Sequence, residues 1–241
     1  MGVPTSIWIM CLITVIYVYD STLFLYRNEV VVVARLRGQY EVKFGSDDFS
    51  FFGKSIFIPN ILLPHRLLYR LSWRPDKTEQ EDDDEISESI QKKLLGIGPY
   101  IWAMFVALFV LLPIGLYIHR GTIVIILTVI YFYLLAIIAL ILIFIERKEL
   151  GIGLYKFAAI SFESLICAPC ALNMTRKVSL AISFRNDVAA VSKKLLKPLD
   201  YNAFIQNLLN VIDSQLLLEA EESTRFHVLR AYRGRISREM S

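Results

Sequence analysis

The chain has 241 residues, of which 55% are hydrophobic and 20% are charged, and its mean hydropathy is +0.50. A soluble domain of this length rarely carries so much apolar surface, and the small numbers of glycine, proline and cysteine exclude collagen, disordered and disulfide-framework proteins. The formal net charge is only +3. The apolar excess is concentrated, because the only ionisable side chains between Pro99 and Ile145 are His119, Arg120 and the tyrosine hydroxyls. The composition therefore predicts an integral membrane protein with polar portions outside the bilayer.

The first apolar segment gives two possible helix ends. Ile7–Tyr19 is shorter than the roughly 20 residues that a membrane-spanning helix needs. Extending the helix to Tyr26 gives a full span and places Asp20 about 9 Å below its end, where the carboxylate would need water, protonation or a cationic partner. The alternative ends the helix at Tyr19 and makes Asp20 part of an interfacial cap. The chain start lacks the basic residues and the small-residue cleavage pattern of a signal peptide, so we expect residues 1–26 to form an uncleaved anchor with Asp20 as a candidate intramembrane acid.

Residues 27–75 predict a small cytoplasmic β-rich domain. β-branched and alternating residues with turn signals over Glu29–Pro64 predict a β-meander of three or four strands. His65–Arg74 has apolar and basic residues at helical spacing, which predicts an amphipathic helix. Its basic face suits anionic lipid headgroups, and a surface helix packed on the strands fits the pattern equally. This face consists of Arg66, Arg70 and Arg74.

An acidic linker and a short interfacial helix are expected over residues 76–98. The acidic run from Asp76 to Glu88 is typical of a solvated segment, and it lacks the glycine and ligand spacing of a calcium-binding loop. We therefore expect no metal site there.

Two apolar segments, Pro99–Ile118 and Thr122–Ile145, are each long enough to cross a bilayer as a helix. Only three residues separate them, so residues 99–146 predict a tight transmembrane hairpin. Pro113 should kink the first helix, because it lacks a backbone donor and its ring crowds the preceding turn. Neither helix carries a charged side chain, which argues against a transport pathway within this chain.

Residues 147–241 predict a helical cytoplasmic region that begins with an interfacial helix. Residues 154–172 are apolar apart from two charged residues and scattered serines, and Pro169 should end any helix there early. A helix at the cytoplasmic interface is therefore favoured over a fourth span. The clearest amphipathic stripe follows at Tyr201–Leu216, with Asp200 as the expected N-cap.

Cys167-Ala168-Pro169-Cys170 is the one reactive-looking motif in the sequence. Structural cysteines are the favoured interpretation, and a redox pair and a metal or acylation site remain as alternatives. The sequence contains no phosphate-binding glycine loop and no metalloprotease or serine-hydrolase motif, and its three histidines offer few general bases. We therefore expect no enzymatic activity, no cofactor and no metal.

The distribution of lysine and arginine predicts an orientation. None precedes Arg27, eleven lie within residues 21–97, one lies at the hairpin tip and fourteen lie within residues 147–241. The positive-inside rule then places the N-terminus and the hairpin tip outside, with both polar portions in the cytoplasm. The basic side chains suit anionic lipid or an acidic partner, and no aromatic platform accompanies them that would suit nucleic acid. The candidate binding residues are Arg66, Arg70, Arg74, Arg176, Lys177, Arg230 and Arg233.

Together these features predict an α-helical inner-membrane protein with three transmembrane helices, a small cytoplasmic β-meander and a helical C-terminal region. We expect a non-enzymatic accessory or scaffold subunit of a secretion, envelope-biogenesis or signalling assembly, bound to other subunits or to copies of itself. One alternative is a membrane-tethered thiol-redox or metal-dependent enzyme centred on Cys167 and Cys170. A second is a lipid- or ion-handling subunit that uses Asp20.

The predicted orientation can be measured with reporter enzymes fused after Ser241. A reporter that works only in the cytoplasm should be active, and one that works only outside the cell should be inactive. The reverse pattern would contradict the orientation.

Overall fold

The structure is a computed structural model. It is mostly helical with small antiparallel strand pairings, and it divides into two compact units. One unit comprises residues 1–24, 46–69 and 85–183, and the other comprises residues 25–45, 70–84 and 184–241. The residues that the structure describes are 5–26, 28–34, 39–44, 46–51, 54–73, 88–118, 121–182 and 187–239. The acidic linker and Arg74 lie outside the described residues, apart from Glu88 at the linker's end.

Helix α1 (Thr5–Ser21) ends where two hydroxyl side chains turn back onto it. Ser21 and Thr22 each donate a hydrogen bond to the carbonyl four residues earlier, at 2.7 and 2.8 Å. Strand β1 (Leu23–Tyr26) follows directly. The helix therefore extends past the shorter end expected from sequence and stops before the longer one. Asp20 lies in its last turn.

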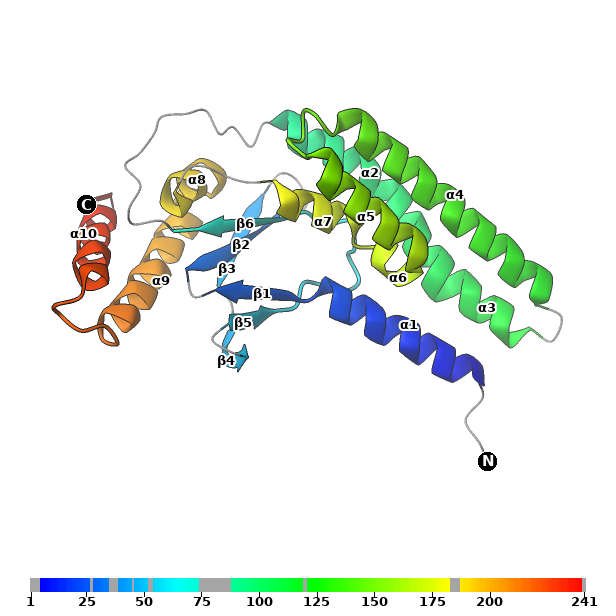
Figure 1. Cartoon of the computed structure of the whole chain (residues 1–241), viewed down its shortest axis with the longest axis horizontal. Helices are drawn as coiled ribbons and strands as arrows, with labels where there is room; N and C mark the ends of the chain where they lie inside the picture. Colours follow the sequence, from blue (N-terminus) through cyan, green and yellow to red (C-terminus); the bar gives the residue numbers. More distant parts are fainter. Residues whose placement is uncertain are drawn as a thin grey trace. The chain divides into compact units, whose positions relative to one another are not determined.

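The predicted hairpin is present, and its first arm is longer than expected. Helix α2 (Glu88–Val106), the π-helical turn η2 (Ala107–Leu111) and helix α3 (Leu112–Tyr117) form one apolar column along helix α4 (Thr122–Glu146) (Figure 1). The column begins before Pro99, which lies inside α2. The extra turns are stabilised by Lys93, which ion-pairs with Glu146 in the last turn of α4 and with Glu149 just beyond that helix.

At Pro113, where the sequence predicts a kink, the structure has a π-helical turn directly before the proline. Proline has no N–H, and its ring crowds the carbonyl four residues earlier, here that of Phe109. In η2 the N–H of Leu112 instead reaches the carbonyl of Ala107, five residues earlier. The wider turn relieves the crowding at the proline ring.

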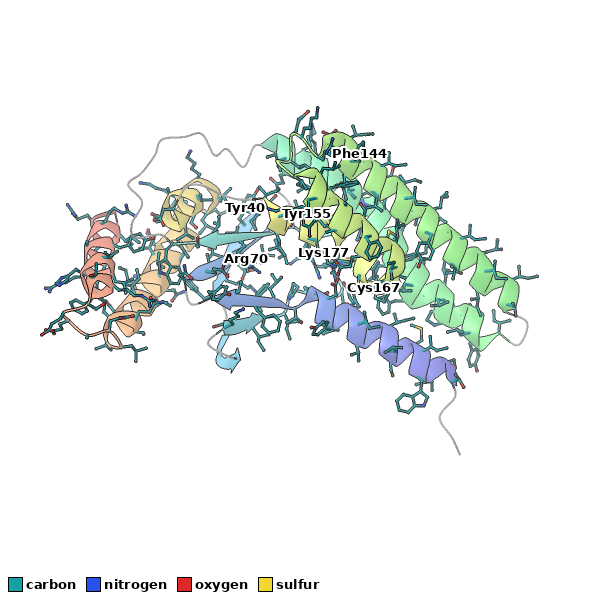
Figure 2. The ribbon with its side chains drawn as sticks, viewed as in Figure 1. Tyr40, Arg70, Phe144, Tyr155, Cys167 and Lys177 are labelled. Atoms are coloured by element: carbon teal, nitrogen blue, oxygen red, sulfur yellow. A yellow bond between two sulfur atoms is a disulfide. The ribbon has the colours of Figure 1, made fainter. Side chains whose placement is uncertain are left out.

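Two helices among the described residues are long and apolar enough to cross a membrane, Ile90–Tyr117 and Thr122–Glu146. Helix α1 is apolar but has only 17 residues. Many large apolar side chains of α1 and α4 project away from neighbouring helices and are exposed (Figure 2).

The strands form two three-stranded sheets, in the orders β1-β5-β4 and β3-β2-β6, in place of the single meander expected from sequence. Strand β2 (Glu29–Ala34) pairs antiparallel with β3 (Tyr40–Phe44), and its apolar run from Val30 onward is buried. Strand β4 (Ser46–Phe51) pairs antiparallel with β5 (Lys54–Phe57).

The amphipathic helix predicted over His65–Arg74 is wrong, because this segment contains strand β6 (Leu68–Ser72), a neighbour of β2. The apolar residues of this short segment fit a helix or a strand, and pairing with a buried β-branched strand decides between them. Leu68, Tyr69 and Leu71 are all at most 2% exposed. Arg70 lies in this strand, so the described residues of the segment do not form the helical arginine face.

The C-terminal region is helical, as predicted. In the first unit the segment predicted to be interfacial comprises α5 (Leu154–Ile166) and α6 (Ala168–Ala171), with Pro169 in the first turn of α6, and α7 (Met174–Ala181) follows. The second unit contains α8 (Val188–Leu195), α9 (Pro198–Leu216) and α10 (Thr224–Glu239).

Helix α9 buries most of its predicted apolar stripe, and Phe204 stacks on Phe44 of β3 with ring centroids 5.7 Å apart. The expected N-cap was wrong, since Lys197 is the N-cap and Asp200 lies in the first turn. The fixed φ of Pro198 suits the first helical position and starts the helix earlier. In α10, the Tyr232 hydroxyl lies 2.7 Å from a carboxylate oxygen of Asp187, and burial raises the pKa of this tyrosine.

The hairpin tip depends on Gly121. Its N–H donates to Ile118 O at 2.9 Å, and a Cβ at this position would lie 1.8 Å from the backbone oxygen of Gly115. We expect Gly121→Ala to destabilise the protein by on the order of 1–3 kcal/mol, the usual cost of overpacking. The measurement is the thermal unfolding midpoint in detergent.

The matched control is Gly96→Ala on α2, where a Cβ would meet nothing within 4 Å. Alanine is favoured over glycine inside a helix by up to about 1 kcal/mol, so this variant should be neutral or slightly stabilised. Equal midpoints for the two variants would contradict the close approach at the tip.

Candidate functional site

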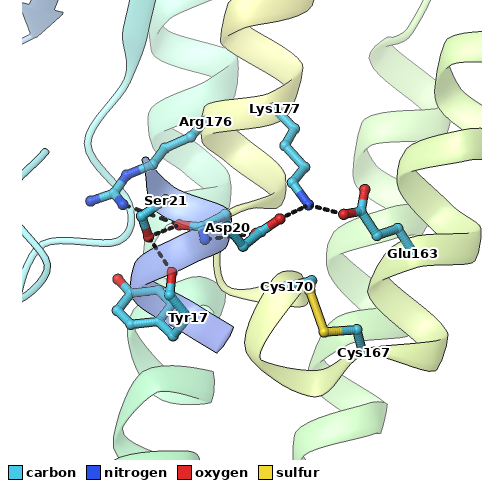
Figure 3. Close-up of polar contacts among 9 residues, drawn as sticks. Tyr17, Asp20, Ser21, Glu163, Cys167, Cys170, Arg176 and Lys177 are labelled. Carbon is cyan, nitrogen blue, oxygen red and sulfur yellow. Dashed lines mark hydrogen bonds and ion pairs between the residues drawn. A yellow bond between two sulfur atoms is a disulfide. The ribbon is translucent and has the colours of Figure 1, made fainter. Parts of the chain in front are cut away.

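Three charged side chains from three helices meet at the end of α1, in the first unit. Lys177 Nζ of α7 lies 2.7 Å from Asp20 Oδ1 of α1 and 2.7 Å from Glu163 Oε1 of α5 (Figure 3). The second oxygen of Asp20 accepts a hydrogen bond from Asn173 Nδ2 at 2.8 Å. We call Asp20, Glu163 and Lys177 the charged cluster. Lys177 is thus the cationic partner that a partly buried Asp20 needs, and it belongs to the same chain.

The position of Asp20 explains why a cation is needed there. The last turn of a helix carries the negative end of the helix dipole, so a carboxylate there is unfavourable unless it is compensated. The Asp20 and Lys177 side chains are only 12% and 19% exposed, so water compensates little of this charge. Lys177 therefore stabilises the end of α1 and links it to α5 and α7.

Arg176 is buried and holds the chain that precedes β6. Its guanidinium donates to Asn173 Oδ1 at 3.0 Å and to the carbonyls of Asn60 and Leu63 at 2.7 and 2.8 Å. Arg176 is only 2% exposed, and burial lowers its pKa. Arg176, which the sequence predicts as a lipid- or partner-binding residue, is instead buried, and its two terminal NH₂ groups bond to Asn173 Oδ1 and to two backbone carbonyls inside the protein.

Further contacts hold α1 against the same segment and against the hairpin. The Tyr17 hydroxyl donates to Ile61 O at 2.7 Å, and its ring packs against Phe105 and Phe109 with centroids 6.2 and 5.6 Å away. Ser21 Oγ lies 3.1 Å from Asn173 Oδ1 (Figure 3). The end of α1 is therefore fixed from several sides, which makes the position of Asp20 well defined.

Cys167 and Cys170 form a disulfide beside the charged cluster (Figure 3). Cys167 ends α5 and is the N-cap of α6, and it is partly exposed. Cys170 lies in α6 and is 7% exposed. Cys170 Sγ and one carboxylate oxygen each of Asp20 and Glu163 all lie within 4.8 Å of one another. The sulfur of Cys170 therefore borders two carboxylates, and the sulfur of Cys167 is more accessible.

This geometry bears on the metal alternative. Asp20, Glu163 and Cys170 are residue types that bind divalent metals, and they lie close together. In the structure, however, Cys170 is bonded to Cys167, and Lys177 Nζ already contacts both carboxylates. The ammonium fills the role that a metal cation would take, so we derive no metal chemistry from this arrangement.

The other predicted basic residues have separate settings. Arg70 of β6 lies 3.9 Å from Glu29, and Arg66 is partly buried. Arg230 is exposed on α10, and Arg233 hydrogen-bonds to Asp213. None of these four belongs to the charged cluster.

Sequence reasoning named Asp20, Lys177 and the two cysteines separately and did not join them. Glu163 is one of the two charged residues within 154–172 that disfavoured a fourth span. A usable signal was present, because an isolated charge in an apolar segment needs a partner. Asp20 and Glu163 are two such acids, and Lys177 is one of several basic residues that could have compensated them.

Comparisons of the chain with protein-family models, with curated proteins and with solved structures found no significant match.

Replacing Lys177 by methionine tests the structural importance of the charged cluster. The change leaves two partly buried carboxylates without their cation, and breaking a buried ion pair costs roughly 3–5 kcal/mol. Because Glu163 is 47% exposed, we expect a loss near the lower limit, which corresponds to a fall in melting temperature of roughly 6–12 °C.

The matched control is Lys156→Met in α5, since this lysine is exposed and makes only a 3.4 Å contact with Ala181 O. It should unfold within about 2 °C of the unmodified protein. If Lys177→Met and Lys156→Met unfolded at the same temperature, the charged cluster would have no structural role.

Proposed function

We propose that the protein spans the inner membrane three times, through α1, the α2–η2–α3 column and α4. Support comes from the exposed character of its apolar helices. The most apolar windows of the two long helices are only 39% and 33% buried, whereas the core helix of a soluble protein is mostly covered. In α1, Trp8, Leu12 and Val15 are 61–65% exposed. Helix α1 has 17 residues, the lower limit for a span.

Lysine and arginine are in excess within residues 21–97 and 147–241. The positive-inside rule then places these portions in the cytoplasm and the N-terminus and hairpin tip outside. The end of α1 that carries Asp20 then lies at the cytoplasmic surface, as do α5, α6 and α7. The disulfide of α6 would accordingly face the cytoplasm.

We propose that this cytoplasmic cysteine pair carries out thiol–disulfide exchange. The observation that carries the proposal is the disulfide against the charged cluster, with Cys170 Sγ and two carboxylates within 4.8 Å of one another. Disulfides in a reducing compartment are usually transient and either catalytic or redox-sensing. A structural bridge is also less expected here, because two cysteines three residues apart close a loop too short to constrain the unfolded chain strongly.

The unequal exposure of the two sulfurs assigns their roles. A thiolate of a partner dithiol attacks the accessible Cys167 Sγ, the Cys167–Cys170 bond breaks, and Cys170 leaves as a thiolate that takes up a proton. The second thiol of the partner loses its proton and attacks the mixed disulfide, which releases Cys167. The net reaction converts the protein disulfide to a dithiol and the partner dithiol to a disulfide, and the reverse sequence reduces a partner disulfide.

The accessory-subunit role is the second proposal, and the exposed apolar face of α5 favours it. Tyr155, Phe162 and Ile166 are 87%, 69% and 66% exposed although α5 lies outside the proposed spans. Such a face suits the bilayer interface or another subunit. A subunit that carries a redox-active cysteine pair is compatible with both proposals. The lipid- or ion-handling alternative has less support, because the Asp20 carboxylate is ion-paired within the chain.

A redox titration tests the exchange reaction. Cys11 is an exposed free cysteine and is first replaced by serine so that only the pair reports. Membranes are equilibrated in thiol–disulfide buffers and the free thiols are counted by a mass-adding maleimide. We expect the reduction potential of the pair to lie between about −300 and −120 mV, the range of exchange-active cysteine pairs. Structural disulfides have reduction potentials below about −300 mV.

Two single-cysteine variants test the assigned roles. Cys170→Ser should accumulate a mixed disulfide at Cys167, because the resolving thiol is absent. Cys167→Ser should accumulate much less, because Cys170 is buried. A pair that stays oxidised below −300 mV, or equal trapping by both variants, would count against the exchange proposal.

A further inference from the structure

The exchange reaction leaves one requirement that the cysteines cannot meet alone. Cys170 is 7% exposed, so the proton that its thiol loses or gains in each cycle is not transferred readily to bulk water. A general base or acid in hydrogen-bond reach, directly or through one water, removes this barrier. The groups that face Cys170 from the helices packed around it are Asp20 on α1, Glu163 on α5 and Lys177 on α7.

We propose that Asp20 accepts the proton of Cys170 when the pair is oxidised and returns it when the pair is reduced, an inference that rests on the exchange reaction above. In oxidation, the Cys170 S–H bond breaks, the proton passes to an Asp20 carboxylate oxygen, and the thiolate attacks Cys167 Sγ of the mixed disulfide. The Cys167–Cys170 bond forms and the partner leaves as a thiolate. In reduction, the departing Cys170 thiolate takes the proton back from Asp20.

Burial distinguishes Asp20 from the second carboxylate. The side chain of Asp20 is 12% exposed, and that of Glu163 is 47% exposed. Asp20 therefore lies on the protected side of the sulfur, and Glu163 lies at the solvent boundary where a proton exchanges with water. The two carboxylates and the sulfur are within 4.8 Å of one another, so one site can receive the proton and the other can release it.

Lys177 and Asn173 act as positioning residues. The Lys177 ammonium bridges the two carboxylates and offsets their repulsion, and Asn173 donates to Asp20 Oδ2 at 2.8 Å. Arg176 adds a second positive charge nearby through its bond to Asn173 Oδ1. These contacts hold Asp20 in one orientation beside Cys170.

The test compares Asp20→Asn with the unmodified chain, both carrying Cys11→Ser. Asparagine keeps the size of aspartate but cannot accept the proton. Full-length protein in detergent is reduced, and its re-oxidation by oxidised glutathione is followed by quenched thiol counting between pH 5.5 and 9. We expect Asp20→Asn to re-oxidise about 10²-fold more slowly at pH 7, the lower range for a general base. The deficit should shrink above pH 8, where hydroxide removes the proton.

Glu149→Gln is the matched control, because Glu149 pairs with Lys93 in the same unit and is not part of the charged cluster. It should re-oxidise at the unmodified rate throughout. If Asp20→Asn does not fold, Glu163→Gln provides the test, because the half-exposed side chain of Glu163 tolerates substitution. This variant should re-oxidise more slowly than the unmodified chain, with a smaller loss of rate than Asp20→Asn and the same pH dependence.

The outcomes separate the two proposals. An unmodified pair that cannot be cycled would overturn both the exchange reaction and the role of Asp20. An unmodified pair that cycles while Asp20→Asn and Glu163→Gln match it at every pH would leave the exchange reaction standing and overturn the proton transfer. If the re-oxidation rate of Asp20→Asn were lowered by the same factor at every pH, Asp20 would have only a structural role.

Discussion

The contact of Lys177 with Asp20 and Glu163 is the interaction on which the first unit depends. It joins the end of the N-terminal helix to two helices that come about 150 residues later in the chain. A carboxylate at the negative end of a helix dipole is unfavourable in isolation. The cation that compensates it therefore fixes where α7 must lie against α1.

The same short helix also holds the chain before β6. Asn173 precedes α7 as its N-cap, and Arg176 and Lys177 follow at a spacing of three and four residues, so all three point to one side. Arg176 donates hydrogen bonds to the carbonyls of Asn60 and Leu63. Asn173 donates a hydrogen bond to Asp20, and Lys177 forms an ion pair with it. One face of α7 therefore provides hydrogen-bond and ion-pair partners both for the loop carbonyls and for the Asp20 carboxylate. These polar groups would otherwise be buried without partners.

The sequence predicted those elements whose signal is local. The apolar hairpin and the break near Pro169 follow from hydropathy and from the missing donor of proline, and both are present, while the irregularity at Pro113 is a π-helical turn. Segment 65–74 was assigned wrongly because its residues fit both a helix and a strand, and only β2 as a neighbour decides. The charged cluster was out of reach for a similar reason. Pairing Asp20 with Lys177 requires the positions of α1 and α7, which no local pattern contains.

The orientation and the cysteine pair constrain each other. If basic residues place α6 at the cytoplasmic surface, a permanent disulfide there conflicts with the reducing compartment, and reversible chemistry is the consistent interpretation. If α6 instead faced outside, the disulfide would need no redox role, but most of the basic residues would have crossed the membrane against the usual bias. The carboxylates beside Cys170 are compatible with the first combination, because besides their structural pairing with Lys177 they lie where an acceptor for the Cys170 thiol proton is needed.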